Sequence, residues 1–177
     1  KGALEAFAVS VRDLVALDVG ASTGGFTDCL LQEGAKKVYA LDVGYGQLAW
    51  RLRRDPRVVP IERTNIRHYD GRDLREEVDL ATVDASFISL KLIVPAICRL
   101  IGKEALLLAL VKPQFEAGRE KVGKNGVVRD PELHKQILEE LQAFFQTLGL
   151  TVRGVCASPL LGPAGNREFF IYAAKQS

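Results

Sequence analysis

Two stretches decide the fold of this chain: Leu-Asp-Val-Gly-Ala-Ser-Thr-Gly-Gly-Phe at residues 17–26 and Tyr-Ala-Leu-Asp-Val-Gly at residues 39–44. An apolar strand ends at Asp18, a glycine-rich loop follows, and a helix begins after the loop. Asp42 closes a second apolar strand 24 residues after Asp18. In open α/β sheets, small loop residues let backbone N–H groups approach a ligand, and the second acidic group accepts hydrogen bonds from ribose hydroxyls. The two stretches therefore predict an α/β fold with a nucleotide-like ligand.

Two common nucleotide fingerprints do not fit this loop. The dinucleotide pattern G-x-G-x-x-G is not met, because Gly20 is followed by glycine only at Gly24 and Gly25, and no P-loop lysine follows. The pattern Asp-x-Gly-x-Ser-x-Gly-Gly instead resembles the first motif of S-adenosylmethionine-dependent methyltransferases. The sulfonium of that cofactor carries no phosphate, so neither a helix dipole nor a lysine is required. Asp18 is expected to lie near its cationic methionine portion.

This resemblance implies an S-adenosylmethionine site built from the loop, the ends of neighbouring strands and the residue Asn65 after the third strand. The implied cofactor-binding residues are Asp18, Gly20, Ser22, Thr23, Gly24, Gly25, Phe26, Asp42, Val43, Asn65 and Asp84. Asn65 is expected to contact the adenine or the ribose. The alternative is a tight strand-to-helix turn that binds no ligand.

Composition sets broad limits on the class of protein. The 177 residues suit one domain, 47% hydrophobic content supports a sizeable core, and a net charge of +2 says little about partners. The longest apolar runs, such as Ala105–Val111, are too short to span a bilayer. Cys29, Cys98 and Cys156 form no C-x-x-C pair, so buried thiols in a reducing cytoplasm are expected, and no metal site is predicted. The chain begins without Met inside a helix-like segment and is expected to be part of a longer protein.

Apolar periodicity alternates strands and helices along the chain. Strands are predicted at Val15–Val19, Val38–Asp42, Val58–Ile61, Asp79–Asp84, Ala105–Val111, Thr151–Cys156 and Glu168–Ala174. Helices are predicted at Ala3–Val9, Gly25–Gln32, Gln47–Arg54, Ser89–Leu100 and Pro131–Leu148. This alternation favours one domain, residues 1–177, with a mostly parallel sheet, helices on both faces and an antiparallel last strand.

Three charged residues lie at predicted strand ends: Asp84, Lys112 and Glu168. If the last strand is antiparallel, its start lies at the same edge as the other strand ends, where ligands bind in such sheets. Each residue taken singly is more often a solvated loop residue, but their shared placement favours a site. Methyl transfer to an alcohol requires the hydroxyl proton to leave as the methyl arrives. Lys112 can accept it only if burial and a second cation hold the amine uncharged, while Asp84 and Glu168 position the amine and the hydroxyl.

Residues 17–27, 84–90, 111–118 and 162–170 closely resemble the TlyA, or hemolysin A, family, and Val-Lys-Pro-Gln-Phe-Glu-Ala-Gly at 111–118 is the most distinctive segment. That family consists of ribosomal RNA 2′-O-ribose methyltransferases with an FtsJ-like catalytic domain. The resemblance therefore implies a Rossmann-like seven-stranded fold, S-adenosylmethionine as cofactor, ribosomal RNA or ribosomal subunits as partner, and a cytoplasmic location.

The same resemblance implies the catalytic residues. Asp84, Lys112 and Glu168 match the last three members of the family's Lys-Asp-Lys-Glu tetrad. The first tetrad lysine is expected shortly upstream of Lys1, and the S4-type RNA-binding domain of relatives is absent from this chain. The resemblance therefore implies that this chain is a catalytic domain that binds the cofactor but methylates weakly or not at all by itself.

Two groups of cations are candidates for RNA contact. The first is Arg119, Lys121, Lys124 and Arg129, in the glycine-rich loop after Lys112. The second is Arg51, Arg53, Arg54 and Arg57, and such a charge run is more often a solvated face. If the first group holds phosphates, binding is sensitive to salt.

Two other functions stay open at this point. One is a membrane-active protein, as the hemolysin label suggests, although no amphipathic or spanning helix stands out. The other is a methyltransferase that acts on a small molecule or a protein, which predicts a closed apolar pocket in place of an open cationic groove. The target nucleotide, the ribosomal subunit and the oligomeric state do not follow from the sequence.

Overall fold

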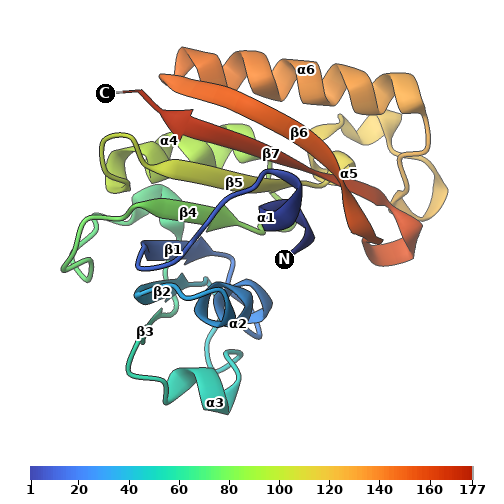
Figure 1. Ribbon diagram of the computed structural model, residues 1–177. Coiled ribbons are helices and arrows are strands. Elements are labelled where there is room, and N and C mark those ends of the chain that lie inside the picture. The colour runs from blue at the N-terminus through green and yellow to red at the C-terminus, as the bar shows by residue number, and fades with distance from the viewer. Residues whose placement is uncertain (177) are drawn as a thin grey trace.

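A seven-stranded sheet forms the centre of the computed structural model, which describes residues 1–176 apart from the side chains of Arg119 and Lys124 (Figure 1). The strands are β1 (Val15–Val19), β2 (Lys37–Leu41), β3 (Val58–Ile61), β4 (Leu80–Val83), β5 (Leu106–Val111), β6 (Leu150–Leu161) and β7 (Arg167–Lys175). Their order is β3-β2-β1-β4-β5-β7-β6. The strands β1 to β5 are parallel, and β7 is antiparallel to both β5 and β6. The predicted mostly parallel sheet with an antiparallel last strand is confirmed.

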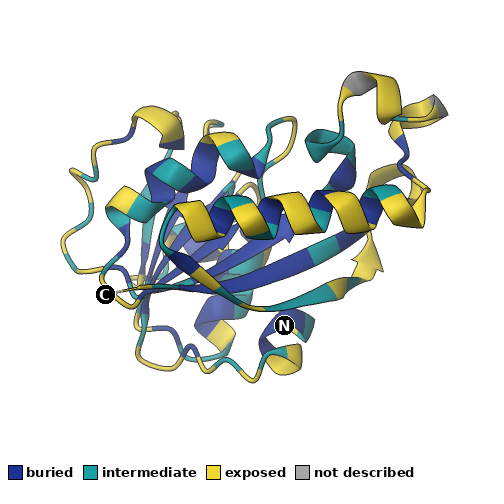
Figure 2. Cartoon of the chain, turned by 90° about the horizontal axis from the view of Figure 1, so that it is seen from above, coloured by how far each residue is buried: buried dark blue, intermediate teal, exposed yellow. Residues whose placement is uncertain are grey.

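Helices cover both faces of the sheet. They are α1 (Gly2–Ala6), α2 (Gly25–Gln32), α3 (Trp50–Arg53), α4 (Leu90–Leu100), α5 (Pro113–Glu116) and α6 (Pro131–Thr147), with 3-10 turns at Ile66–His68, Arg119–Lys121, Lys124–Gly126 and Pro163–Gly165. On one face, α4 and α6 bury Ile97 and Leu141, and on the other α1 and α2 bury Leu4 and Leu30. Figure 2 shows the buried strands in dark blue between these layers, while α6 turns an exposed face to solvent. The strands are apolar on both sides, as expected for a covered parallel sheet.

Four elements differ from the prediction by more than one or two residues. Helix α1 ends at Ala6, because Ala8 has a φ of 52°, in the left-handed region that ends a helix. The predicted helix 47–54 shortens to α3. Strand β6 continues to Leu161, because its pairing with β7 continues past two register shifts that bend it. Helix α5, which begins with Pro113 at its first position, was absent from the prediction.

Further expectations concern cysteines, metals and membranes. Cys29, Cys98 and Cys156 are free thiols that are only partly buried, so the expectation of buried thiols is wrong. In the described part of the chain, no group of three potential ligands could hold a metal ion. Among residues 1–176, no helix has the length and apolar character needed to cross a bilayer.

Candidate active site

Two glycines of the loop between β1 and α2 allow close backbone approach. Gly20 has a φ of 83°, and a Cβ there would lie 2.2 Å from the carbonyl oxygen of Asp84. Gly24 has a φ of 100°, and its Cβ would lie 2.3 Å from Leu52 Cδ1, so the glycine lets α3 pack on the loop. Gly25 differs, because the space beside its Cβ position is open. Gly20 thus brings the ends of β1 and β4 together, and Gly25 leaves room at the start of α2.

Asp18 lies beneath this loop. Its side chain is fully buried, with Oδ2 accepting from Thr27 Oγ1 at 2.7 Å and Oδ1 accepting from Thr82 Oγ1 at 2.9 Å. Burial raises the pKa of Asp18 to about 6, against the opposing effect of these hydrogen bonds. This placement corrects the prediction that Asp18 contacts the cofactor, because neither oxygen is accessible. Asp18 instead ties β1 to α2 and β4 and supports the loop from below.

We expect Asp18→Asn to flatten the pH dependence of stability. The pKa of Asp18 is about 6 in the folded protein and near 3.8 when unfolded, so the folded state holds this proton more tightly. The stability contributed by the proton is fully present below about pH 4 and is lost as the pH rises through 6. Relative to the variant, the free energy of unfolding should fall by about 2 kcal/mol between pH 4 and 7. Urea denaturation of both proteins across this range measures the difference, and parallel pH profiles would contradict it.

A cavity of about 510 Å³ opens beside the loop, at the carboxyl ends of β1, β2 and β4. Six of the predicted cofactor residues line it: Gly20, Ser22, Asp42, Val43, Asn65 and Asp84. Among the other predicted loop residues, Thr23 offers its carbonyl to the N–H of Ala49, and the Phe26 ring faces Phe170 on the α1/α2 side of the sheet. Gln47, Thr64 and Phe87 also line the cavity. Sequence reasoning missed these three, because they belong to none of the motifs that it used for the cofactor.

Asp42 is fixed in the cavity wall by backbone donors. Its Oδ2 accepts from the N–H of Ser22 at 2.8 Å, and its Oδ1 accepts from the N–H of Gly44 at 2.7 Å. A carboxylate offers about four lone-pair sites, so Asp42 keeps capacity for hydroxyl donors. The Asn65 side-chain oxygen accepts from the N–H of Arg67 at 3.0 Å and caps a 3-10 turn. Asn65 therefore has a structural role in addition to its place in the cavity wall.

Asp84, Lys112 and Glu168 meet at the same edge of the sheet, as predicted. The β5–β7 register pairs Val111 with Phe169, so the next residues, Lys112 and Glu168, follow at the same level. Lys112 Nζ lies 2.6 Å from Asp84 Oδ1, and the Lys112 side chain is 12% exposed. Glu168 is buried, and this burial raises the pKa of its carboxyl against the opposing effect of Lys112. The amine of Lys112 is therefore paired with Asp84, and its charge also stabilises the ionised form of Glu168.

This cluster is short of hydrogen-bond donors. Lys112 Nζ donates to Ser86 Oγ at 2.8 Å, but among the described residues Glu168 Oε1 and Gln114 Oε1 are buried without a donor. Of the described cations, only Lys112 forms an ion pair with Asp84, so the expected second cation is not among them. A buried acceptor without a donor costs about 1–3 kcal/mol, and such atoms mark a place where a bound group can donate.

Glu116 joins the two segments that carry Asp84 and Lys112. Its Oε2 accepts from Ser89 Oγ at 2.6 Å, and its Oε1 accepts from the N–H of Leu90 at 2.8 Å. Helix α5 directly follows Lys112, and α4 begins at Leu90, so this contact fixes the helix after Lys112 against the start of α4. Glu116, the glutamate of the distinctive Lys-Pro-Gln-Phe-Glu segment, thus has a structural role.

Glu116→Ala is expected to lower the free energy of unfolding by about 2 kcal/mol, because two hydrogen bonds to a partly buried carboxylate are lost. Glu116→Gln retains an acceptor for the N–H of Leu90 and a polar contact with Ser89, so a smaller loss is expected. Urea denaturation of the two variants measures the difference. Equal losses would contradict the role of the carboxylate oxygens, since both variants lack the charge.

Phe87 is the most exposed aromatic side chain near this cluster. It is 89% exposed, its ring lies 4.9 Å from that of Phe115, and its φ is 63°. A bulky residue rarely adopts a positive φ, and backbone strain of this kind concentrates at functional sites. The loop between Asp84 and α4 therefore presents an aromatic face to solvent at the mouth of the cavity.

The predicted RNA-binding loop is only partly described. The side chains of Arg119 and Lys124 lie outside the described part of the chain. Lys121 lines a hollow on the solvent side of α6 together with Asp130 and other charged residues. Arg129 lines a different groove, between α6 and β7. The two described cations of this loop therefore lie in separate hollows.

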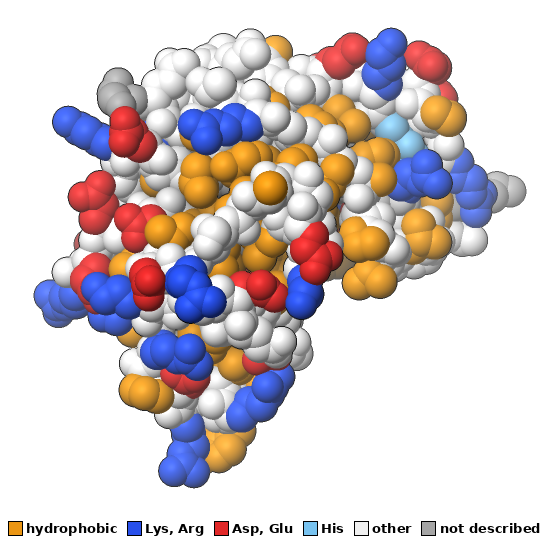
Figure 3. Space-filling model, viewed as in Figure 1, with side chains coloured by type: hydrophobic (Ala, Val, Ile, Leu, Met, Phe, Trp, Pro, Cys, Tyr) orange, Lys and Arg blue, Asp and Glu red, His pale blue; other side chains and the backbone are white. Residues whose placement is uncertain are grey.

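The second basic cluster is spread over the lower end of the molecule in Figure 3, around α3 and β3. Arg51 pairs with Asp28 at 2.7 Å, Arg53 with Glu62 at 2.5 Å and Arg57 with Asp55 at 2.7 Å, while Arg54 lies over the Trp50 ring. These partners indicate that the four arginines stabilise the local structure and are not held ready for RNA.

Comparison with known proteins matches residues 1–175 to the family described as FtsJ-like methyltransferase. The "Putative rRNA methyltransferase YqxC" of Bacillus subtilis is 52% identical over 171 residues, which cover 96% of this chain and 61% of that protein. The "16S/23S rRNA (cytidine-2'-O)-methyltransferase TlyA" of Mycobacterium tuberculosis is 51% identical over 176 residues, which cover 99% of this chain and 66% of that protein. The chain thus spans less than two thirds of the length of both relatives.

Solved structures agree with these matches. The "Putative hemolysin from Streptococcus thermophilus" is 47% identical and has a TM-score of 0.96, over 99% of this chain and 64% of that chain. S-adenosylmethionine-dependent methyltransferases at 12% and 17% identity have a TM-score of 0.69 and share the fold alone. The predicted Rossmann-like methyltransferase fold is confirmed.

Proposed function

Because the chain belongs to the FtsJ-like methyltransferase family, we propose that residues 1–177 form the catalytic domain of an enzyme that methylates a ribose 2′-hydroxyl of ribosomal RNA with S-adenosylmethionine. The observation that carries this proposal is the meeting of Asp84, Lys112 and Glu168 beside the cavity at the strand ends. The name of the Mycobacterium tuberculosis relative supports cytidine as the target. A ribosomal substrate supports a cytoplasmic location, which is part of this proposal.

The cavity beside the glycine loop fits S-adenosylmethionine. Its volume of about 510 Å³ lies within the usual range of ligand pockets, roughly 300–1,000 Å³. Asp42, fixed by two backbone donors, would accept the ribose hydroxyls of the cofactor, and Asn65 would contact its adenosine portion. The open space beside Gly25 leaves room at the helix start. When bound, the cofactor supplies an electrophilic methyl group.

The residues of the cluster would orient the target hydroxyl and receive its proton. The hydroxyl is a poor nucleophile, so its O–H proton must leave as the new bond forms. Glu168 Oε1, a buried acceptor without a donor among the described residues, would accept the hydrogen bond of that hydroxyl. Lys112 Nζ, held by Asp84 and Ser86, would take the proton in its uncharged form, which requires a second cation from outside the described residues. Holding both reactants in place would contribute most of the rate.

The exposed ring of Phe87 supports a nucleic-acid substrate over a small molecule. A small-molecule enzyme would enclose its substrate in an apolar pocket, whereas this cavity opens beside a ring that is 89% exposed. Proteins that act on single nucleotides commonly stack the base on an aromatic side chain. We expect Phe87→Ala to weaken RNA binding about tenfold, because stacking contributes roughly 1–3 kcal/mol per base. Phe87→Tyr retains the stacking face and should keep wild-type KM for RNA, measured by steady-state methyl transfer.

Incubation of the chain and of its full-length parent with ribosomal subunits and methyl-labelled S-adenosylmethionine tests the proposal. Label on a 2′-O-methyl nucleoside after nuclease digestion is the expected result. Label on protein alone, or on neither, would contradict the proposal. A dye-release assay with liposomes tests the membrane-active alternative, and no release is expected.

A further inference from the structure

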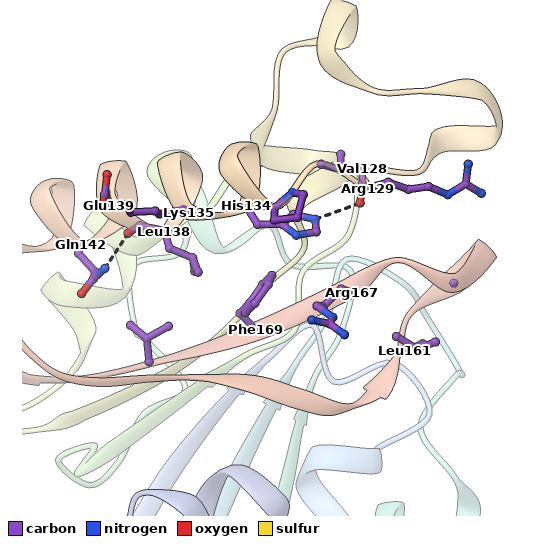
Figure 4. Close-up of a pocket in the computed structure, with 13 residues that line it drawn as sticks. Val128, Arg129, His134, Lys135, Leu138, Glu139, Gln142, Leu161, Arg167 and Phe169 are labelled. Carbon is purple, nitrogen blue, oxygen red and sulfur yellow. Dashed lines mark hydrogen bonds between the residues drawn. The ribbon is translucent and has the colours of Figure 1, made fainter.

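A groove between α6 and the β6–β7 hairpin lies apart from the cavity beside β1 (Figure 4). Its volume is about 850 Å³, and Leu138, Val155 and Phe169 contribute apolar surface to its floor. Phe169 projects from β7 toward α6, and the His134 ring meets it edge-on with 5.3 Å between centroids. The groove therefore offers an aromatic surface that the proposed chemistry does not use.

Cations outnumber acids along this groove. Arg129, Lys135 and Arg167 line it, against the single acidic residue Glu139. In Figure 4, Arg129 extends outward from the segment before α6, and Arg167 extends from the start of β7. A groove with three cations and an apolar floor complements a ligand that combines anionic groups with flat apolar rings, as a strand of RNA does.

The groove and the catalytic cluster share strand β7. Neighbouring residues of a strand point to opposite faces, so Arg167 and Phe169 face the groove, while Glu168 between them faces the cluster. All three lie within the first three residues of β7. A polymer that places one unit against Glu168 therefore meets the groove by passing over the start of this strand.

The wall of the groove is held in place before any partner binds. His134 Nε2 contacts the carbonyl oxygen of Val128 at 2.9 Å. Asn166 accepts from the N–H of Val128 at 3.1 Å and donates to the carbonyl of Gly126 at 3.0 Å. These bonds fix the end of the long loop against the β6–β7 hairpin, which places Arg129 at the groove.

We propose that this α6 groove binds the sugar–phosphate backbone of the RNA strand next to the target nucleotide. The inference rests on the proposed function, and it adds the path of the substrate strand. Arg129 and Arg167 would hold phosphates at the end near the cluster, and Lys135 would hold one further along α6. Flanking bases would stack on Phe169.

Salt-dependent RNA binding tests this proposal. The probe is a fluorescent single-stranded RNA of mixed sequence, about 15 nucleotides long, titrated with the chain at several salt concentrations. Each lost phosphate contact should reduce the slope of log K against log salt by about 0.7, so the triple variant Arg129→Gln, Lys135→Gln, Arg167→Gln should lose about 2 in slope. Lys103→Gln, in the exposed turn between α4 and β5 at the opposite end of the strands, is the matched control and should keep the wild-type slope.

Calorimetry with S-adenosylmethionine and methylation of ribosomal subunits are measured for the same proteins. Unchanged cofactor binding and raised KM for subunits, together with the reduced slope, would support the groove. A triple variant with the wild-type slope would overturn it and leave the proposed function intact. Weaker binding to subunits with unchanged binding of the free RNA would indicate that the groove contacts a ribosomal protein. This result would also overturn the proposal. Failure of the natural chain and its full-length parent to methylate any RNA would count against the proposed function itself.

Discussion

Replacing Lys112 with alanine is expected to reduce methyl transfer about a thousandfold while leaving S-adenosylmethionine binding nearly unchanged. A positioned general base contributes roughly 10²–10⁴-fold, and Lys112 is the proposed base, paired with Asp84 and level with Glu168 at the ends of β5 and β7. The residues proposed to hold the cofactor's adenosine, Asp42 and Asn65, lie on other elements of the cavity wall. Single-turnover transfer and calorimetric titration with the cofactor measure the two effects separately.

Lys112→Arg tests whether Lys112 acts by accepting a proton or only through its positive charge. Arginine retains the positive charge beside Asp84, but it does not give up its proton in proteins. We therefore expect this variant to fold and bind cofactor normally, yet to transfer methyl groups as poorly as Lys112→Ala. Full activity of Lys112→Arg would exclude lysine as the proton acceptor. Loss of cofactor binding in both variants would indicate a structural role for the lysine.

Gly20→Ala should have the second large effect, a loss of cofactor affinity of at least a hundredfold together with reduced stability. The new Cβ would lie 2.2 Å from the carbonyl oxygen and 2.9 Å from the carbonyl carbon of Asp84. Both contacts involve backbone, so the ends of β1 and β4 must separate. The positive φ of Gly20 adds about 1 kcal/mol for any residue with a Cβ. Calorimetry with the cofactor and thermal denaturation measure the two losses.

Gly149→Ala is the matched control for this substitution. Gly149 has a φ of 75°, but nothing lies within 4 Å of its Cβ position. The residue follows α6, away from the cavity. This variant should therefore lose only the stability that the unfavourable backbone conformation costs, and its cofactor affinity should stay unchanged. Equal losses of affinity in both variants would show that the contact with Asp84 is not the cause.

Much of the fold follows from the sequence, because its strands are short apolar runs bounded by polar residues. Strands β1 and β3 match their predicted bounds, and the hairpin that closes the chain predicts the antiparallel direction of β7. That direction in turn predicts the meeting of Lys112 and Glu168. Helix α3 is less predictable, because a four-residue helix carries no periodic signal.

The parts of the site that sequence reasoning missed depend on tertiary packing. Asp18 follows the acidic pattern of a ligand contact, but its strand is buried and two threonine hydroxyls surround it. Phe87 gains its importance from its exposure and its backbone conformation, and neither can be read from the sequence. The α6 groove depends on how α6 lies across the β6–β7 hairpin, and the predicted strand Thr151–Cys156 does not include the second half of β6, which bends past two register shifts.

The position of β7 has a consequence for biosynthesis. Of the seven strands, β7 is translated last, yet it lies in the interior of the sheet, between β5 and β6. A nascent chain that still lacks residues 167–175 leaves β5 without its neighbour and lacks Glu168, so these residues must be translated before the sheet and the cluster are complete. Products that end before β7 would then carry an open sheet edge, which invites aggregation and proteolysis, and would lack the proposed site residue Glu168.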